Sequence, residues 1–279
     1  MPFQRWPARA SRLLFPLLVT AVFAGCAAFS AGADAPVARR VAALLPTDAL
    51  LLGEQHDAPE HHVIERETVE ALIARGQLAA LALEMAEEGR STARLAATAS
   101  ETQVQAALDW NDKAWPWRNY GPTVMAAVRA GVPVVGANLP RARMKDAMAD
   151  VSLDVQLNGE AYTAQQDAVR EGHCKLLPES QIIPMTRIQV GRDRAMAQTI
   201  VKARQPGKTV LLIAGAGHAV RALGVPQHLP DDVKVASVRL LASSTTEVVA
   251  GEYDSTWQTP PMPEKDYCAE LRQPAAKRS

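Results

Sequence analysis

The sequence lacks the charge imbalance and the long apolar segments that mark several classes of protein. Its 30 basic and 30 acidic residues give a net charge of zero, which argues against a protein that holds nucleic acid by broad electrostatics. The apolar stretch at residues 13–24 is shorter than the roughly 20 residues that a membrane-spanning helix needs. There is no internal repeat. With 279 residues, 48% of them hydrophobic, the chain can bury the core of one large or two small globular domains.

Several catalytic motifs are missing as well. The histidines do not have the H-E-x-x-H spacing of the zincins, and there is no G-x-S-x-G nucleophile elbow and no P-loop. The stretch GAGHAV has glycines at 215 and 217, but the dinucleotide-binding fingerprint requires a third glycine where Val220 stands. This argues against a nicotinamide site. A close approach of the backbone to His218 or to a ligand explains these glycines better.

The first 25 residues have the pattern of a secretory signal peptide. Three arginines precede the apolar stretch and small residues follow it. Cys26 comes directly after Ala24-Gly25, as in a bacterial lipobox, in which the cysteine becomes the lipidated first residue. An ordinary signal peptide cut nearby, at AGA or AFS, is the alternative. Removal of residues 1–25, which hold three arginines and no acid, would change the net charge from 0 to −3.

The rest of the chain divides into three parts. Residues 26–40 are small and polar and predict a tether, residues 41–253 predict one α/β domain, and residues 254–279 predict an extended tail. If Cys26 carries lipid, only Cys174 and Cys268 remain. An even pair in an exported protein predicts one disulfide, which would tie the tail to the middle of the chain. Two unpaired thiols are the alternative.

Apolar runs alternate with helix-like segments along the domain. Strands are predicted at 49–54, 78–85, 132–138, 209–218 and 233–241, and helices at 57–76, 123–131, 141–171 with a break near Asn158-Gly159, and 187–204. Continuous apolar strands separated by helices predict an α/β fold with a mostly parallel central sheet and helices on both faces. The long segments 86–122 and 139–186 predict helical insertions that cap the carboxyl ends of the strands.

The predicted helix 57–76 has recognisable start and stop signals. Asp57 is placed to be its N-cap, Pro59 lies in the first turn, and Glu60 would complete a capping box. Gly76 is placed to end it. His61 and His62 lie in its first turns, where a solvated helical face is the simpler interpretation for at least one of them.

Polar residues follow four of the apolar runs. The first run ends in Glu54 and His56, the second in Glu84, the third in Asn138, and the fourth in the stretch that contains His218. Ligands of open parallel sheets bind outside the carboxyl ends of the strands, so these residues are predicted to converge there. Two carboxylates and two imidazoles suit Zn, Mn or Fe(II), and they also suit acid–base catalysis at neutral pH. The alternative is that each residue caps a helix or binds loop backbone.

The segment 109–122 is rich in aromatic residues, with Trp110, Trp115, Trp117 and Tyr120 within eleven positions. A flat aromatic wall suits a large planar ligand or an apolar substrate. Packing of the insertion onto the sheet explains the same residues equally well. Tyr120 adds a phenolate that can bind iron, because tyrosine is one of the axial ligands of haem.

Two further segments contain candidate ligand-binding residues. His173 lies beside Cys174 and faces either the site or the surface. Arg192 and Asp193 are adjacent on a predicted helix and therefore point to different sides. Arg192 is placed to meet an anionic group such as a propionate or a phosphate, with a structural ion pair as the alternative. Arg141 is a second candidate for such a contact.

Five motifs, in this order, resemble the ChaN family of haem-binding lipoproteins. They are LLGEQHD, LALEM, WRNYGPTVMAAVRAGVPVVGANLPR, RDRAMA and VLLIAGAGHAVRALGVP, and the resemblance covers residues 45–230. This family belongs to a wider superfamily with the Tiki proteases and the erythromycin esterases. The resemblance implies an α/β sheet with helical insertions, binding of haem or iron, and export to the periplasmic face of the bacterial outer membrane.

The resemblance also implies roles for the residues already selected. The glycine–x–x–histidine pairs of the superfamily match 53–56 and 215–218, and in the Tiki relatives such motifs belong to a metal-dependent hydrolytic site. His56, Tyr120, His173 and His218 all stay open as the axial ligand of haem. Trp117 and its neighbours would flank the macrocycle, and Arg192 would meet its propionates.

The sequence thus predicts an exported, membrane-tethered protein that binds haem or iron and acts in their uptake. The expected partners are haem or an iron-bearing small molecule, the membrane through lipid on Cys26, and a second copy of the chain in a homodimer. The alternative is a metal-dependent hydrolase, with His56 and His218 as ligands of a divalent transition-metal ion and Glu54 or Glu84 as general base. A binding module for another planar ligand is the third interpretation.

Overall fold

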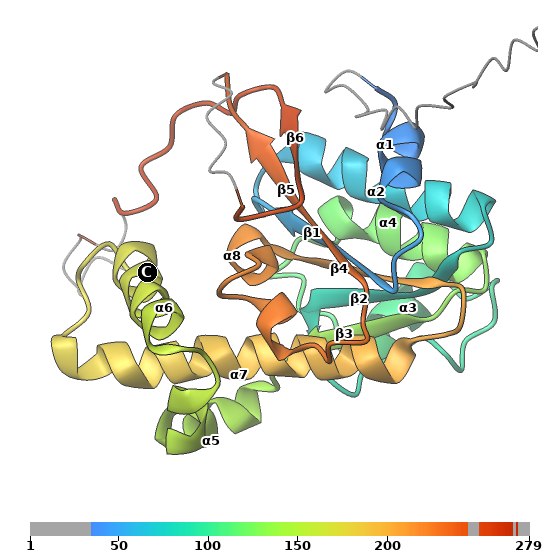
Figure 1. The fold of residues 1–279 in the computed structure, drawn as a ribbon. Coiled ribbons are helices and arrows are strands. Elements are labelled where there is room, and N and C mark those ends of the chain that lie inside the picture. Colours follow the sequence, from blue (N-terminus) through green and yellow to red (C-terminus); the bar gives the residue numbers. More distant parts are fainter. Residues whose placement is uncertain (1–34, 245–250, 270–271, 273–279) are drawn as a thin grey trace, which may run out of the picture. The chain divides into compact units, whose positions relative to one another are not determined.

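The computed structural model describes residues 35–244, 251–269 and 272 (Figure 1). The predicted signal peptide, Cys26 and most of the predicted tether lie outside these residues. Helix α1 (Val37–Leu44) begins within the last part of that tether, and its Val37 and Val41 are buried in the core. In the described part of the chain, no helix is both long and apolar enough to cross a membrane.

Within the described residues, six parallel strands form one sheet, which confirms the predicted fold class. The strands are β1 (Ala49–Glu54), β2 (Leu78–Glu87), β3 (Val134–Asn138), β4 (Thr209–Gly215), β5 (Val235–Ala242) and β6 (Ser255–Thr259). They lie in the order β3-β2-β4-β1-β5-β6, so β4 and β1 occupy the middle of the sheet, flanked by β2 and β5. All five predicted strands are present.

The sequence analysis missed β6, which lies in the segment predicted to be an extended tail. This strand pairs with β5 along residues 255–259 and completes one edge of the sheet. Only Trp257 and Thr259 of its five residues are buried, and two prolines follow directly. Its apolar signal was therefore too short to stand out.

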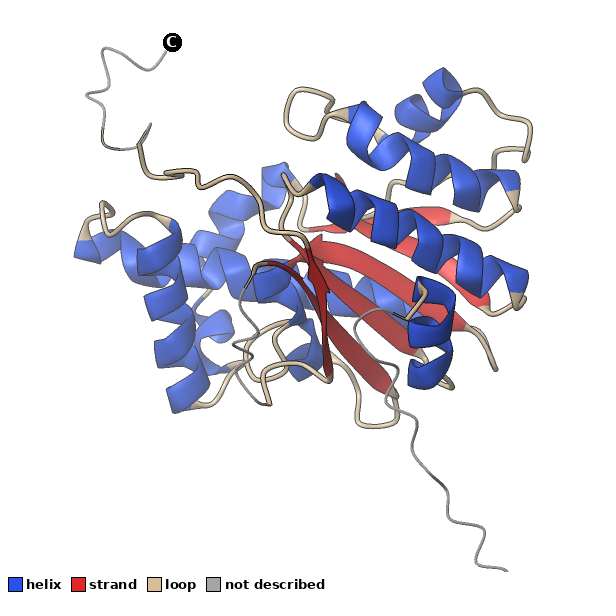
Figure 2. Ribbon diagram, turned by 90° about the horizontal axis from the view of Figure 1, so that it is seen from above, coloured by secondary structure: helices blue, strands red, loops and turns tan. Residues whose placement is uncertain are grey.

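Both faces of the sheet are buried because alternate side chains of each strand point to opposite sides. In β1, Leu50 and Leu52 enter the core beneath α1, α2 (Pro59–Ala74) and α4 (Trp117–Arg129). Ala49 and Leu51 enter a second core, which α7 (Glu179–Ala203) covers. Figures 1 and 2 show α2 and α4 on one face of the sheet and α7 on the other.

Two helical insertions accompany the sheet, as predicted. The first contains α3 (Glu101–Leu108), which packs with the tryptophan-rich segment onto the core of the α2 face. The second contains α5 (Met144–Ala149), α6 (Gly159–Gly172) and the short 3-10 turns 141–143 and 151–155, which share a small core with α7. Asn158 is the N-cap of α6, so the predicted break falls at the start of this helix.

Two helices begin earlier than predicted, and in each case a proline lies inside the helix. Helix α4 starts at Trp117 and passes through Pro122, and α7 starts at Glu179 and passes through Pro184. The prediction started each helix after its proline. Each proline is the sixth residue of its helix, so it removes one hydrogen bond to residue i−4, and the helix continues through it.

The predicted capping box of α2 is wrong, although both ends of the helix are close to their predicted positions. The N-cap is Ala58, which has no side chain to accept a hydrogen bond, and Pro59 is the first helical residue. The carboxylate of Asp57 instead accepts hydrogen bonds from Lys265 and Tyr267 of the tail. At the other end Gly76 adopts a φ of +65°, which favours glycine and ends the helix as predicted.

The predicted disulfide between Cys174 and Cys268 is confirmed. It joins the tail to the residues that follow α6, 94 positions earlier in the chain. Together with the hydrogen bonds to Asp57, it holds the tail beside the carboxyl end of β1.

Gly53 determines how closely the short helix α8 (Ala216–Ala219) approaches β1. A Cβ atom at this position would lie 2.9 Å from the Cα of Ala216 and 3.0 Å from the Cβ of Ala219. We expect Gly53→Ala to destabilise the protein by about 1–3 kcal/mol, the usual cost of forcing extra volume into a packed core. Unfolding in urea measures this change.

Gly217→Ala is the matched control, because a Cβ there would meet nothing within 4 Å. It should leave the stability unchanged or raise it slightly, since alanine favours a helix over glycine. Equal effects of the two substitutions would contradict the close packing of α8 against β1.

Candidate functional site

The carboxyl ends of the central strands gather the predicted acid–base residues at one edge of the sheet. Glu54 ends β1, and Glu84 lies near the carboxyl end of the buried part of β2. His218 lies in α8, directly after β4. His56 follows β1 by two residues. The predicted convergence of these four residues is therefore present in the structure.

The four residues are arranged as a chain of alternating acids and imidazoles. The carboxylate of Glu54 accepts a hydrogen bond from Nδ1 of His56 at 2.9 Å, and Nε2 of His56 lies 3.8 Å from Oε2 of Glu84. The other oxygen of Glu84 lies 3.5 Å from Nε2 of His218. The backbone N–H of Gly215 donates to Glu84 at 2.8 Å and fixes its orientation.

Asp193, on α7, completes this chain from the opposite side of His218. Its carboxylate lies 2.6 Å from Nδ1 of His218, and both side chains are buried. Burial alone would lower the pKa of His218, but Asp193 and Glu84 outweigh burial and raise it to about 10. The same pairing lowers the pKa of Glu84 against the opposing effect of burial. Glu84 and His218 therefore form an ion pair at neutral pH.

Glu54 is in a different electrostatic state from Glu84. Burial and the nearby carboxyl of Glu65 raise its pKa to about 8, although His56 acts in the opposite direction. Its Oε1 also accepts a hydrogen bond from the hydroxyl of Tyr120 at 3.0 Å. Two carboxyl groups at the same sheet edge thus hold protons with very different strength, which is an arrangement that acid–base sites commonly use.

The histidines of α2 are buried, contrary to the predicted solvated face. His61 is fully buried, and its Nδ1 accepts a hydrogen bond from the backbone N–H of Gln55 at 2.9 Å. Burial lowers the pKa of His61 to about 4. The ring of His62 packs edge-on against Tyr120, and its side chain is only 9% exposed. Both histidines lie on the face of α2 that packs toward β1 and α4, which the sequence pattern did not indicate.

A cleft of about 680 Å³ opens above this cluster, which is within the size range of small-molecule sites. Glu54, His56 and Glu84 lie at its base, and the side chain of His56 is 38% exposed. Helices α6 and α7 form one wall, through Val169 and Arg192 among others. The tail contributes Tyr267. The second helical insertion therefore caps the carboxyl ends of the strands, as predicted.

Arg192 lies in the wall of this cleft, as predicted. Its Nε is buried and has no hydrogen-bond partner among the described residues, so one donor is left for a ligand. Gly215 also lies in the wall, and a Cβ there would come within 2.9 Å of Nε2 of His56. This glycine therefore leaves room for His56, whereas the prediction named His218 or a ligand.

Other predicted ligand-binding residues lie elsewhere. The structure buries Tyr120 beneath His62 and Glu54, and none of the three tryptophans of segment 109–122 lines the cleft. Trp115 contacts the edge of the His56 ring, whereas Trp117 donates a hydrogen bond to Glu101. The hydrophobic packing of these aromatic residues against the α2 face favours the packing alternative.

The remaining candidates are also outside the lining of the cleft. His173 caps the carbonyl of Val169 at the end of α6 through its Nδ1. Arg141 lies in an exposed turn, where its backbone N–H donates to Glu87. The side chain of Asn138 donates to the backbone carbonyl of Glu84 at 2.9 Å and so supports the end of β2.

The sequence analysis missed Asp193 and Glu65 as members of the cluster. Both lie in the middle of helices, α7 and α2, where a lone acidic residue looks like part of a solvated surface. The only available signal was their position among buried residues at helical spacing, Thr68 and Val69 for Glu65 and Val190 and Ala197 for Asp193.

A family model described as "Haem-binding uptake, Tiki superfamily, ChaN" matches residues 40–229 of the chain. The chain belongs to this family. The matched range includes the site segments 53–56 and 215–218, which confirms the resemblance drawn from the motifs. No curated protein matches the chain.

A solved structure of another ChaN protein is similar to this chain. The structure described as "Cofacial heme binding to ChaN of Campylobacter jejuni" is 26% identical, has a TM-score of 0.66, and matches 77% of this chain and 89% of that chain. The type III effector HopBA1 is 15% identical with a TM-score of 0.44, over 81% of this chain and 94% of that one. The RRSP effector domain of a MARTX toxin from Vibrio vulnificus is also 15% identical, with a TM-score of 0.44, over 72% and 35%.

The contact between Asp193 and His218 predicts how this ChaN-family protein responds to pH. Because the pKa of His218 is about 10 in the folded state and about 6.5 in an unfolded chain, the folded state binds this proton more tightly. The resulting stabilisation is complete below pH 6.5 and is lost as the pH rises to about 10. Asp193→Asn should lower the pKa of His218 and reduce this loss. Histidine NMR titration and urea unfolding between pH 6 and 10 measure the two effects.

Asp57→Asn is the control for this experiment, because Asp57 lines the same cleft but bonds to the tail. It should leave the His218 titration unchanged. A wild-type His218 resonance that titrates near pH 6.5, identified by its absence in His218→Gln, would contradict the ion pair.

Proposed function

We propose that this chain is an exported, membrane-tethered protein that binds haem in the cleft above Glu54, His56 and Glu84 and acts in the uptake of haem or iron. Its membership of the ChaN family is the observation that carries this proposal. The ChaN structure from Campylobacter jejuni, which is described as binding haem cofacially, supports it, because that likeness extends over 77% of the chain.

The residues of the cleft fit a haem ligand. Part of its wall is aliphatic, through Val169, Val220 and Leu223, and apolar walls suit a porphyrin ring. The unpartnered Nε of Arg192 is a charged donor for a propionate carboxylate. His56 and His218, two of the predicted axial ligands, both line the cleft. The ring of His218 is held between Asp193 and Glu84, so we assign iron to the more exposed imidazole of His56, whereas Tyr120 is too deeply buried to reach the cleft.

The hydrolase alternative is less well supported. The four predicted donors are joined to one another by hydrogen bonds and ion pairs, and both ring nitrogens of His218 face a carboxylate, Nδ1 that of Asp193 and Nε2 that of Glu84. Among the described residues, a different set of three side chains, Glu54, His62 and Glu65, brings its donor atoms within 4.8 Å of one another.

Haem titration into the purified protein tests the proposed function. We expect a shifted Soret band that saturates, and Arg192→Ala should weaken binding about 10- to 100-fold, the effect of losing one hydrogen bond to a charged group at roughly 1.5–3 kcal/mol. His56→Ala should change the position of the band, since it removes the proposed axial ligand. Sedimentation velocity with and without haem tests the proposed homodimer.

Arg194→Ala is the matched control, because Arg194 lies on the same helix but lines cavities away from this cleft. It should bind haem as the wild type does, and so should Tyr120→Phe. A titration without a Soret shift in the wild-type protein would refute haem binding. Equal losses of haem affinity in Arg192→Ala and Arg194→Ala would show that haem does not bind beside Arg192.

Export and lipid attachment form the second part of the proposal. The lipobox-like sequence before Cys26 supports it, and so does the disulfide between Cys174 and Cys268, since disulfides persist in oxidising compartments such as the periplasm. The periplasmic face of the outer membrane is the proposed location, on the basis of the family resemblance alone.

Expression of the full chain in a Gram-negative host tests the anchor. The wild-type protein should be labelled by radioactive palmitate and sediment with membranes. Cys26→Ala should lose the label and appear in the soluble fraction, whereas Cys174→Ala, which removes a cysteine of the disulfide, should keep the label. A Cys26→Ala protein that still sediments with membranes would show that lipid on this residue is not the anchor.

A further inference from the structure

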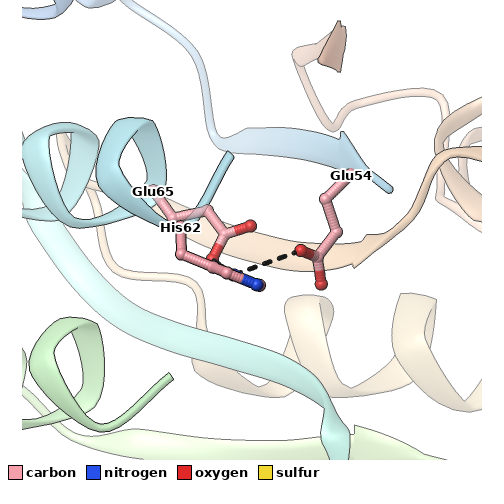
Figure 3. Close-up of side chains that lie close together, drawn as sticks. All are labelled: Glu54, His62 and Glu65. Carbon is pink, nitrogen blue, oxygen red and sulfur yellow. Dashed lines mark hydrogen bonds and ion pairs between the residues drawn. The ribbon is translucent and has the colours of Figure 1, made fainter. Parts of the chain in front are cut away.

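A second cluster of ionisable side chains lies beneath the cleft. It consists of Glu54, at the end of β1, and His62 and Glu65, one turn apart on α2 (Figure 3). Nδ1 of His62 lies 3.5 Å from Oε2 of Glu54 and 3.3 Å from Oε2 of Glu65. One donor atom from each of the three residues falls within 4.8 Å of the others, which is the spacing of ligands around a single metal ion.

The cluster leaves polar atoms without partners in a place that water does not reach. Oε2 of Glu54, Oε1 of Glu65 and Nε2 of His62 are buried and make no hydrogen bond within the described part of the chain. Glu65 is fully buried, and Glu54 is 2% exposed. Buried acceptors without partners are costly, and in native proteins they point to a missing water, proton or ion.

Within the described residues, only histidines face the two carboxyl groups. Their ion-pair partners in the described residues are His56 and His62 only, and no lysine or arginine approaches either carboxylate. His56 also faces Glu84, so His62 is the imidazole that lies between Glu54 and Glu65. With both carboxyl groups ionised beside one neutral imidazole, the site has a formal charge of −2, and one divalent cation that displaces their protons would neutralise it.

We propose that Glu54, His62 and Glu65 form an internal binding site for one divalent transition-metal ion, which lies beneath the cleft and shares Glu54 with it. Two carboxylate oxygens and one imidazole nitrogen suit Zn²⁺ and Mn²⁺. The hydroxyl of Tyr120 donates to Oε1 of Glu54 and leaves Oε2 directed to the metal, which is the orienting contact that metal ligands usually have. Glu54 also lies at the base of the cleft, so the ion enters from there.

The competing occupant is a single proton shared between the two carboxyl groups. A proton would also relieve their repulsion, and burial raises the pKa of Glu65 to about 7. The two occupants differ in one measurable way, because a proton leaves the protein without any bound metal and without any metal-dependent change in stability.

Zinc binding to the metal-free protein, without a histidine tag, tests the site. The protein is treated with EDTA, dialysed, titrated with ZnCl₂ in a calorimeter and analysed for retained zinc, and MnCl₂ is titrated in parallel. We expect one equivalent of metal and a rise in melting temperature. Glu65→Gln should weaken binding by at least the roughly 10–100-fold that loss of an outer-shell contact costs. This variant keeps the shape of the side chain, and circular dichroism checks its fold.

Two further variants make the outcome decisive. Glu70→Gln removes an exposed carboxyl from the same helix and should bind zinc as the wild type does. His218→Asn alters the acid–base chain in the cleft and should also keep the zinc. Loss of zinc in His218→Asn with retention in Glu65→Gln would place the metal in the cleft and overturn the proposal. Absence of zinc and manganese binding in the wild type would identify the occupant as a proton and also overturn it.

Discussion

The buried carboxyl group of Glu54 belongs both to the chain of acids and imidazoles at the base of the cleft and to the cluster with His62 and Glu65 beneath it. Its Oε1 accepts hydrogen bonds from His56, which faces the cleft, and from Tyr120, which lies in the core. Its Oε2 faces His62 in the second cluster, which Glu54 forms with His62 and Glu65. Any charge that binds on one side of Glu54 therefore changes the affinity of the other side for protons or cations. Burial, which raises the pKa of Glu54 to about 8, makes this carboxyl group sensitive to both neighbours.

The rest of the fold keeps this carboxyl group in place with small residues and backbone contacts. Gly53 lets α8 pack directly against β1, which brings His218 to the sheet edge. Gly215 leaves room for His56 while its N–H holds Glu84. The adjacent residues Arg192 and Asp193 of α7 both line the cleft, and Asp193 also binds His218. A single helix thus contributes to ligand binding and to the positioning of the cluster.

The parts of the site that the sequence predicts are those at strand ends. Glu54, Glu84 and His218 could be placed together because apolar strands are easily recognised and parallel strands share one carboxyl edge. Glu65 and Asp193 could not, because they reach the cluster from helices, and the face that a helix buries depends on its neighbours in the fold. The aromatic residues of segment 109–122 were misleading for a related reason: a tryptophan suits a ligand wall and a core equally well, and only the packing of α3 and α4 decides between them.

The tail was predicted as an appendage, yet it contributes to the cleft. Tyr267 lines the cleft and donates to Asp57, and Lys265 binds the same carboxylate, but these contacts are exposed and surface ion pairs contribute little, about 0–1 kcal/mol each. The disulfide at Cys268 is therefore the main constraint that keeps Tyr267 at the cleft, since it prevents the tail from leaving α6. In a reducing compartment that constraint is lost and the cleft loses one of its walls. The disulfide thus links the position of Tyr267 at the cleft to the oxidising compartment that the proposed export would provide.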